Sequence, residues 1–145
     1  MKRIVHLLLL CALSTTAAAQ SFNPPMNATD PKEFGEVVKA ELITPDMEAA
    51  KIAPIPVEIS VSLKKPIPMG CQYVYRVTNR STDRAVKLKM YTVPDAKFEE
   101  KIKPGETVEL LTNTMTRCGA TKEEKKERGC IDCQFSLTIT EIEVK

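Results

Sequence analysis

Residues 57–63 read Val57-Glu58-Ile59-Ser60-Val61-Ser62-Leu63, so that apolar and polar side chains alternate with a period of two. Successive side chains of a β-strand point to opposite faces of its sheet, and this pattern therefore predicts a strand with one buried face. The same period returns near the end of the chain, in Cys133-Gln134-Phe135-Ser136-Leu137-Thr138-Ile139. Two such strands in one short chain indicate an all-β fold.

Weaker alternation lies between these two strands, at residues 71–77, 86–90, 98–102 and 107–111. Turn-forming residues separate these segments, at Asn79–Asp83, Pro94-Asp95 and Pro104-Gly105. The run Lys64–Gly70, which contains two prolines, is expected to end the first strand. Six short strands without helical patterns between them predict a β-sandwich, and Val38 to Ile43 is a candidate for a seventh strand.

The final strand contains a break in its period. Its inward positions include Leu137 and Ile139, but the apolar side chains then continue at Ile142 and Val144. One extra residue shifts the phase of a strand in this way, and we therefore predict a β-bulge near Thr140 or Glu141.

The first 19 residues have the three parts of a secretory signal peptide, namely basic Lys2-Arg3, an apolar run from Ile4 to Leu13, and Ala17-Ala18-Ala19. Cleavage is expected after Ala19, which predicts a periplasmic or secreted protein without an integral membrane segment. A lipid anchor on Cys11 is the disfavoured alternative, because the residue before a lipidated cysteine is small and Leu10 is not.

The composition of the chain after cleavage argues against several classes of function. The only histidine of the sequence, His6, lies in the signal peptide, so the cleaved chain has none. This excludes a Ser-His-Asp triad, a Cys-His dyad and a histidine-ligated metal. Without Lys2 and Arg3 the 21 basic residues fall to 19, equal to the 19 acidic ones. A neutral chain of this kind is not typical of proteins that bind nucleic acid. We expect no enzymatic activity and no cofactor.

The chain divides at about residue 57. Residues 20–56 hold six of the ten prolines and are expected to be extended, whereas residues 57–145 form the sandwich domain. One short helix is predicted within the first segment, because Asp30 is a good N-cap and Pro31 suits the first helical position. The apolar face of this helix would contain Phe34, Val37 and Val38.

Residues 77–88 and 102–110 resemble bacterial immunoglobulin-like modules. In those modules a strand ends in a polar turn near an asparagine, here Asn79, and a Pro-Gly-Glu turn, here Pro104-Gly105-Glu106, opens a later strand. The resemblance implies an immunoglobulin-like β-sandwich of six to seven strands. It implies nothing about the ligand, and the chain lacks the core tryptophan of antibody domains.

Four cysteines remain after signal cleavage, and an even number in a small exported domain indicates disulfides. Strand phase places Cys71 and Cys133 inward on different strands, which predicts a Cys71–Cys133 bridge through the core and a Cys118–Cys130 bridge that closes a loop. A redox pair of Cys130 and Cys133 is an alternative, although Asp132 between the two thiols disfavours a thiolate. A four-cysteine zinc site is a second alternative, disfavoured because Cys71 and Cys118 lie far apart in the sequence.

The loop between Cys118 and Cys130 carries charges of both signs. Its charged run consists of Lys122, Glu123, Glu124, Lys125, Lys126, Glu127 and Arg128. Mixed charges are typical of a solvated turn or short helix, but a tethered loop on a rigid scaffold is also a candidate recognition loop.

Two other features have a structural and a functional interpretation. Tyr73 and Tyr75 share the inward phase of their strand and are expected in the core, not on a stacking surface. Asn27 and Asn79 each begin an N-glycosylation triplet, a pattern that is common by chance.

Together these features predict a non-catalytic exported interaction or structural module that belongs to a larger envelope, pilus or secretion assembly. Its partner would be a protein, docked on an exposed edge strand. The alternatives are a thiol-redox protein that uses Cys130 and Cys133, and a secreted enzyme inhibitor that acts through the charged loop.

Overall fold

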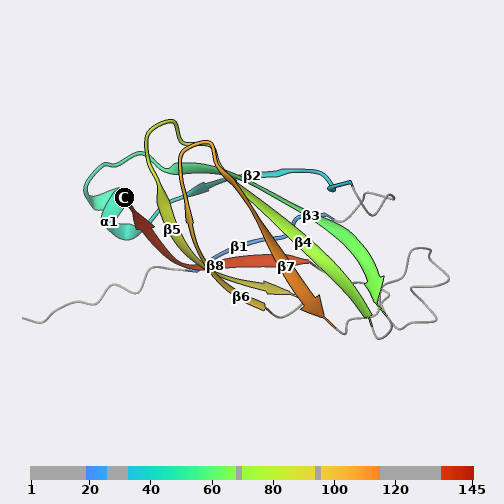
Figure 1. Cartoon of the computed structure of the whole chain (residues 1–145). Coiled ribbons are helices and arrows are strands. Elements are labelled where there is room, and N and C mark those ends of the chain that lie inside the picture. Colours follow the sequence, from blue (N-terminus) through green and yellow to red (C-terminus); the bar gives the residue numbers. More distant parts are fainter. Residues whose placement is uncertain (1–18, 26–32, 68–69, 94–95, 115–134) are drawn as a thin grey trace, which may run out of the picture.

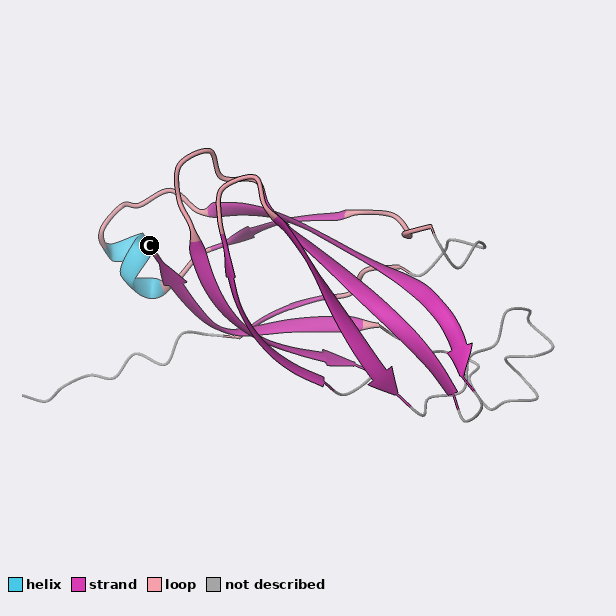
Figure 2. Ribbon diagram, viewed as in Figure 1, coloured by secondary structure: helices cyan, strands magenta, loops and turns pink. Residues whose placement is uncertain are grey.

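Two antiparallel four-stranded sheets lie face to face in the computed structural model, which describes residues 19–25, 33–67, 70–93, 96–114 and 135–145 (Figure 1). The first, called the β5 sheet, has the order β1 (Gln20–Phe22), β8 (Ser136–Val144), β5 (Val86–Val93) and β6 (Ala96–Ile102). The second, called the β4 sheet, has the order β2 (Val38–Leu42), β3 (Ile55–Ile67), β4 (Gly70–Asn79) and β7 (Thr107–Thr114). The predicted all-β fold and β-sandwich are confirmed (Figure 2).

All six predicted strands overlap β3 to β8, and the seventh candidate is β2. Strand β1 was not predicted, because three residues are too few to show a period; it forms by pairing with Leu137–Ile139 of β8. The predicted end of the first strand at Lys64 is wrong, since β3 continues to Ile67 after a register shift between Leu63 and Lys65. Strand β2 pairs with β3 only as far as Ile59, so at Pro66 the strand that pairs with β3 among the described residues is β4. Proline is tolerated where a strand is paired on one side only, because its missing N–H is then not needed by a second neighbour.

The helix predicted after Asp30 is wrong over its described residues. Residues 34–37 are not helical and Val38 begins β2, because the backbone pairs with β3 through a bond from Gly35 N–H to Val61 O (3.0 Å). The helix in the described part of the chain is α1 (Pro45–Ala49). Its N-cap is Thr44, whose hydroxyl accepts a hydrogen bond from Met47 N–H at 3.2 Å.

The predicted bulge in the last strand is confirmed. In the pairing of β5 with β8, Lys89 lies opposite Glu141 and Met90 lies opposite Ile139, so that Thr140 is the extra residue. The Thr140 hydroxyl donates a hydrogen bond to Lys89 O at 3.2 Å. The bulge returns Ile142 to the inward phase, opposite the buried Leu88.

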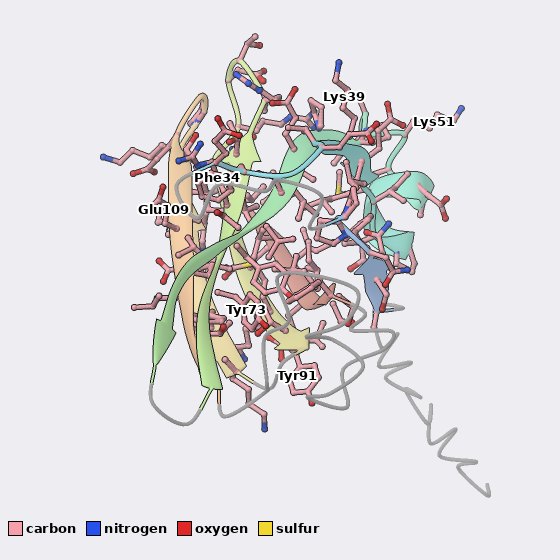
Figure 3. The ribbon with its side chains drawn as sticks, turned by 90° about the vertical axis from the view of Figure 1, so that its right-hand side faces the viewer. Phe34, Lys39, Lys51, Tyr73, Tyr91 and Glu109 are labelled. Carbon is pink, nitrogen blue, oxygen red and sulfur yellow. The ribbon has the colours of Figure 1, made fainter. Side chains whose placement is uncertain are left out.

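The inner faces of both sheets form one apolar core. Tyr73 and Tyr75 are 1% and 0% exposed, as predicted, and Figure 3 shows Tyr73 on the inner side of the β4 sheet. The Tyr73 ring meets the Phe135 ring edge-on, with centroids 4.7 Å apart, and so links the two sheets. The other fully buried large side chains are Leu42, Ile55, Ile59, Leu88, Ile102, Leu110, Leu137, Ile139, Val57 and Val61.

Burial of the two tyrosines predicts alkaline unfolding, because burial raises the pKa of both Tyr73 and Tyr75. An unfolded tyrosine ionises near pH 10. Stability is therefore unaffected by these groups at lower pH and falls as the pH rises above about 10. In a Tyr91→Phe variant, absorbance at 295 nm should show tyrosinate only together with loss of the β-sheet circular dichroism. Ionisation of both groups near pH 10 in a chain that keeps its β-sheet signal would contradict this.

Candidate interaction surface

Most of the sequence-predicted site residues lie outside the described residues. These are Cys118, Cys130, Cys133 and the charged run at 122–128. Cys71 belongs to β4, where its backbone lies opposite Pro66 of β3 and Thr114 of β7. Both disulfide bridges, the redox alternative and the candidate recognition loop therefore stay predictions.

Asn79 has a structural role at one end of the sandwich. Its side chain is 0% exposed, and its Nδ2 donates to Arg84 O (2.8 Å) and Ile102 O (3.1 Å). Its Oδ1 accepts a hydrogen bond from Ser81 N–H at 2.9 Å, and its backbone O accepts one from Gly105 N–H at 2.8 Å. A glycan on Nδ2 is incompatible with this folded corner, so the glycosylation interpretation of Asn79 is not supported. Asn27, which begins the other triplet, lies outside the described residues.

Four strands form the edges of the two sheets, and three of them have features that discourage pairing with another chain. Strand β1 has three residues. Strand β2 has five residues. The Gln20 side chain bonds to its end, as a donor to Glu41 O and as an acceptor from the N–H of Ile43, the residue after β2, both at 3.3 Å. In β6, four of the seven residues are charged, and Glu100 stands opposite Leu88 on the inward phase.

Strand β7 lacks these features. Its eight residues contain no proline, glycine or lysine, and Glu109 is its one charged residue. Asn79 N–H donates to Glu106 O at 3.0 Å, so these two residues are a hydrogen-bonded pair of the ladder between β4 and β7. Such pairs recur at every second residue of an antiparallel ladder, and the even-numbered residues of β7 therefore bond to β4. The N–H and C=O groups of Thr107, Glu109 and Leu111 then point to the open edge, and no hydrogen bond found between described residues engages them.

The outer face beside this edge combines one exposed leucine with a closed ion pair. Leu111 is 38% exposed and lies opposite Val74 of β4, which is 5% exposed. Next to it, Arg76 Nη2 lies 2.7 Å from Glu109 Oε1. The Arg76 guanidinium also stacks on the Phe34 ring, 3.7 Å from its centroid, and Figure 3 shows Phe34 and Glu109 on this side of the molecule. The charge of Glu109 is thus already matched within the chain.

A shallow hollow of about 510 Å³ lies on the other sheet, beside the Thr140 bulge. Its lining includes Lys89, Tyr91, Lys97, Glu99 and Thr140. Most of its charges are paired: the Lys89 ammonium lies 2.8 Å from Glu141, and Lys87 contacts Glu99. Accordingly Glu141 raises the pKa of Lys89, and Lys87 lowers the pKa of Glu99. This mutually neutralised surface is a weaker candidate than the β7 edge.

Comparisons with protein-family models, with curated proteins and with solved structures found no match. Within the part of the chain that the structure describes, no three His, Cys, Asp or Glu side chains gather as a metal site. No helix among the described residues is long and apolar enough to cross a membrane. The geometry of the chain itself therefore carries the functional argument.

Proposed function

We propose that this chain is a non-catalytic exported interaction module, part of a larger envelope, pilus or secretion assembly, that docks a protein partner by strand addition to β7. The observation that carries the proposal is the β7 edge, which has no protective feature among the described residues, while the other three edge strands have at least one. Extended peptides commonly bind an exposed sheet edge in this way. Export to the periplasm or the cell exterior follows from the expected signal peptide.

Strand addition fits the chemistry of this edge. The outward N–H and C=O groups of Thr107, Glu109 and Leu111 would gain partners, and the main chain would supply most of the affinity. The partner would also cover Leu111, which supplies an apolar contact of the kind that stabilises interfaces.

We also propose that the sandwich is immunoglobulin-like. Support comes from the two stretches that resemble such modules, because they meet at one corner. Asn79 from the first stretch binds Ile102 O and Gly105 N–H from the second. Gly105 has a φ of +73°, a left-handed conformation that glycine adopts without strain, which explains the Pro-Gly turn.

Leu111→Pro tests the docking edge. Proline removes the outward N–H of Leu111 but leaves the bonds from β7 to β4, so we expect a fold with β-sheet content close to wild type. Affinity purification of the tagged chain from its native envelope fraction should recover at least tenfold less partner with this variant. Val37→Ser is the matched control, since Val37 is also an exposed apolar residue, at 45%, and recovery should be unchanged.

Two outcomes would contradict the proposal. One is undiminished partner recovery with a folded Leu111→Pro variant. The other is an equal loss with Val37→Ser, which would indicate a general effect of removing exposed apolar surface. If Leu111→Pro does not fold, Leu111→Lys replaces it, because a charge on an edge strand opposes strand addition without altering the backbone.

A further inference from the structure

We propose that the occupant of the β7 edge is a second copy of this chain, paired antiparallel about a twofold axis at Leu111. This inference rests on the proposed strand addition and names its partner. The two β4 sheets would then form one continuous sheet across the dimer. Such an isologous interface needs a surface that is complementary to itself, and the β7 sequence meets this condition.

Register is the first argument. Because the outward groups belong to Thr107, Glu109 and Leu111, the symmetric pairings centred near the middle of β7 are those about Glu109, about Leu110 and about Leu111. Symmetry about Glu109 places two carboxylates opposite each other, which is unfavourable. Symmetry about Leu110 places each Glu109 opposite Leu111, so that neither leucine gains an apolar partner. Symmetry about Leu111 places Leu111 opposite Leu111 and Glu109 opposite position 113, an asparagine. That register contains no pair of like charges.

Charge is the second argument. The one charged side chain of β7, Glu109, already pairs with Arg76 at 2.7 Å, and Arg76 stacks on Phe34. The edge therefore offers no unmatched charge to a strongly acidic or basic partner, and it fits an uncharged strand best. Strand β7 is itself a strand of this kind, whereas β2 carries Lys39 and Glu41 on one face and β6 carries charges on both faces.

Burial is the third argument. Leu111 is 38% exposed in the single chain and lies beside Val74 of β4, which is 5% exposed. The twofold axis would bring the two Leu111 side chains together between the two Val74 residues, and the resulting apolar contact would be flanked by the two Arg76–Glu109 pairs. A strand-to-strand interface of this type is small, so we expect a concentration-dependent dimer and not a permanent one.

The test is sedimentation equilibrium of the oxidised mature chain from about 1 to about 500 μM, a range that covers weak interfaces. We expect the mass to rise from one chain to two over this range. Leu111→Lys, which places two ammonium groups together at the axis, should weaken the dimer at least tenfold. Val37→Lys introduces the same charge at an exposed apolar residue outside β7 and should leave the dimer unchanged.

A charge-swap experiment tests the register itself. Leu111→Lys and Leu111→Glu should each be monomeric alone, and an equimolar mixture of the two should form a mixed dimer. A mixture that stays monomeric would overturn the register at Leu111. A dimer that persists in Leu111→Lys would place the interface elsewhere and overturn the proposal.

A wild-type chain that stays monomeric at about 500 μM would also overturn the second copy as occupant. Strand addition of a different partner would survive that result, because the purification with Leu111→Pro tests it separately. The two proposals can therefore fail independently.

Discussion

Replacing Asn79 with alanine is expected to lower the free energy of unfolding by about 3–5 kcal/mol. The change removes both amide donors and the acceptor of a fully buried side chain. It leaves Arg84 O, Ile102 O and Ser81 N–H without their partners, and each buried polar group left unpaired costs about 1–3 kcal/mol. The loss is a large share of the roughly 5–15 kcal/mol by which a typical domain is stable.

Two further variants separate hydrogen bonding from shape. Asn79→Asp keeps the acceptor for Ser81 N–H but directs a carboxylate oxygen at two carbonyl oxygens, so it should destabilise at least as much as alanine. Thr82→Ala changes an exposed residue of the same turn and should stay within about 0.5 kcal/mol of wild type. Urea unfolding followed by circular dichroism measures all three. A loss below about 1 kcal/mol for Asn79→Ala would contradict the assigned role of this corner.

The period of two predicted the strands because burial of one face is a local property of the sequence. It also predicted the Thr140 bulge, since the apolar phase slips where the extra residue lies. The helix shows where local signals fail. Asp30-Pro31 and Thr44-Pro45 carry the same capping signal, and the second begins α1. Asp30 and Pro31 lie outside the described residues, but residues 34–37, which the first signal predicted as helix, are not helical. In this segment Gly35 N–H bonds to Val61 O and Phe34 packs on Arg76, contacts with the β4 sheet that a local capping signal does not reveal.

The candidate surface depends on information that no local pattern contains. The uncharged sequence of β7 is visible in the chain, but its place at the edge follows from the strand order. The stack of Arg76 on Phe34 joins residues that are distant in the sequence and also could not be predicted. Sequence reasoning instead selected the charged run at 122–128, because its composition and flanking cysteines are local features.

The predicted phase of the cysteine strands agrees with the described core. Tyr73, Tyr75 and Val77 of β4 are buried, as are Phe135, Leu137 and Ile139. The rings of Tyr73 and Phe135 are 4.7 Å apart between centroids, and each predicted bridge cysteine lies two residues before one of these rings. Strands β4 and β8 also run in the same general direction in Figure 1. This geometry supports the prediction that Cys71 pairs with Cys133.

Replacing Cys71 and Cys133 together with alanine is therefore expected to cost about 2–5 kcal/mol, because the bridge closes a long loop in the unfolded chain. The double replacement of Cys118 and Cys130 is the matched control. It removes a bridge that closes a shorter loop of charged residues, and the melting temperature should fall less. Peptide mapping without reduction identifies the pairs, and thermal unfolding measures both variants.

If the Cys118/Cys130 variant unfolds and the Cys71/Cys133 variant does not, the stabilising bridge closes the charged loop and not the core. A peptide in which Cys130 is joined to Cys133 would instead favour the redox alternative. A bridge across only two intervening residues closes too short a loop to stabilise the sandwich.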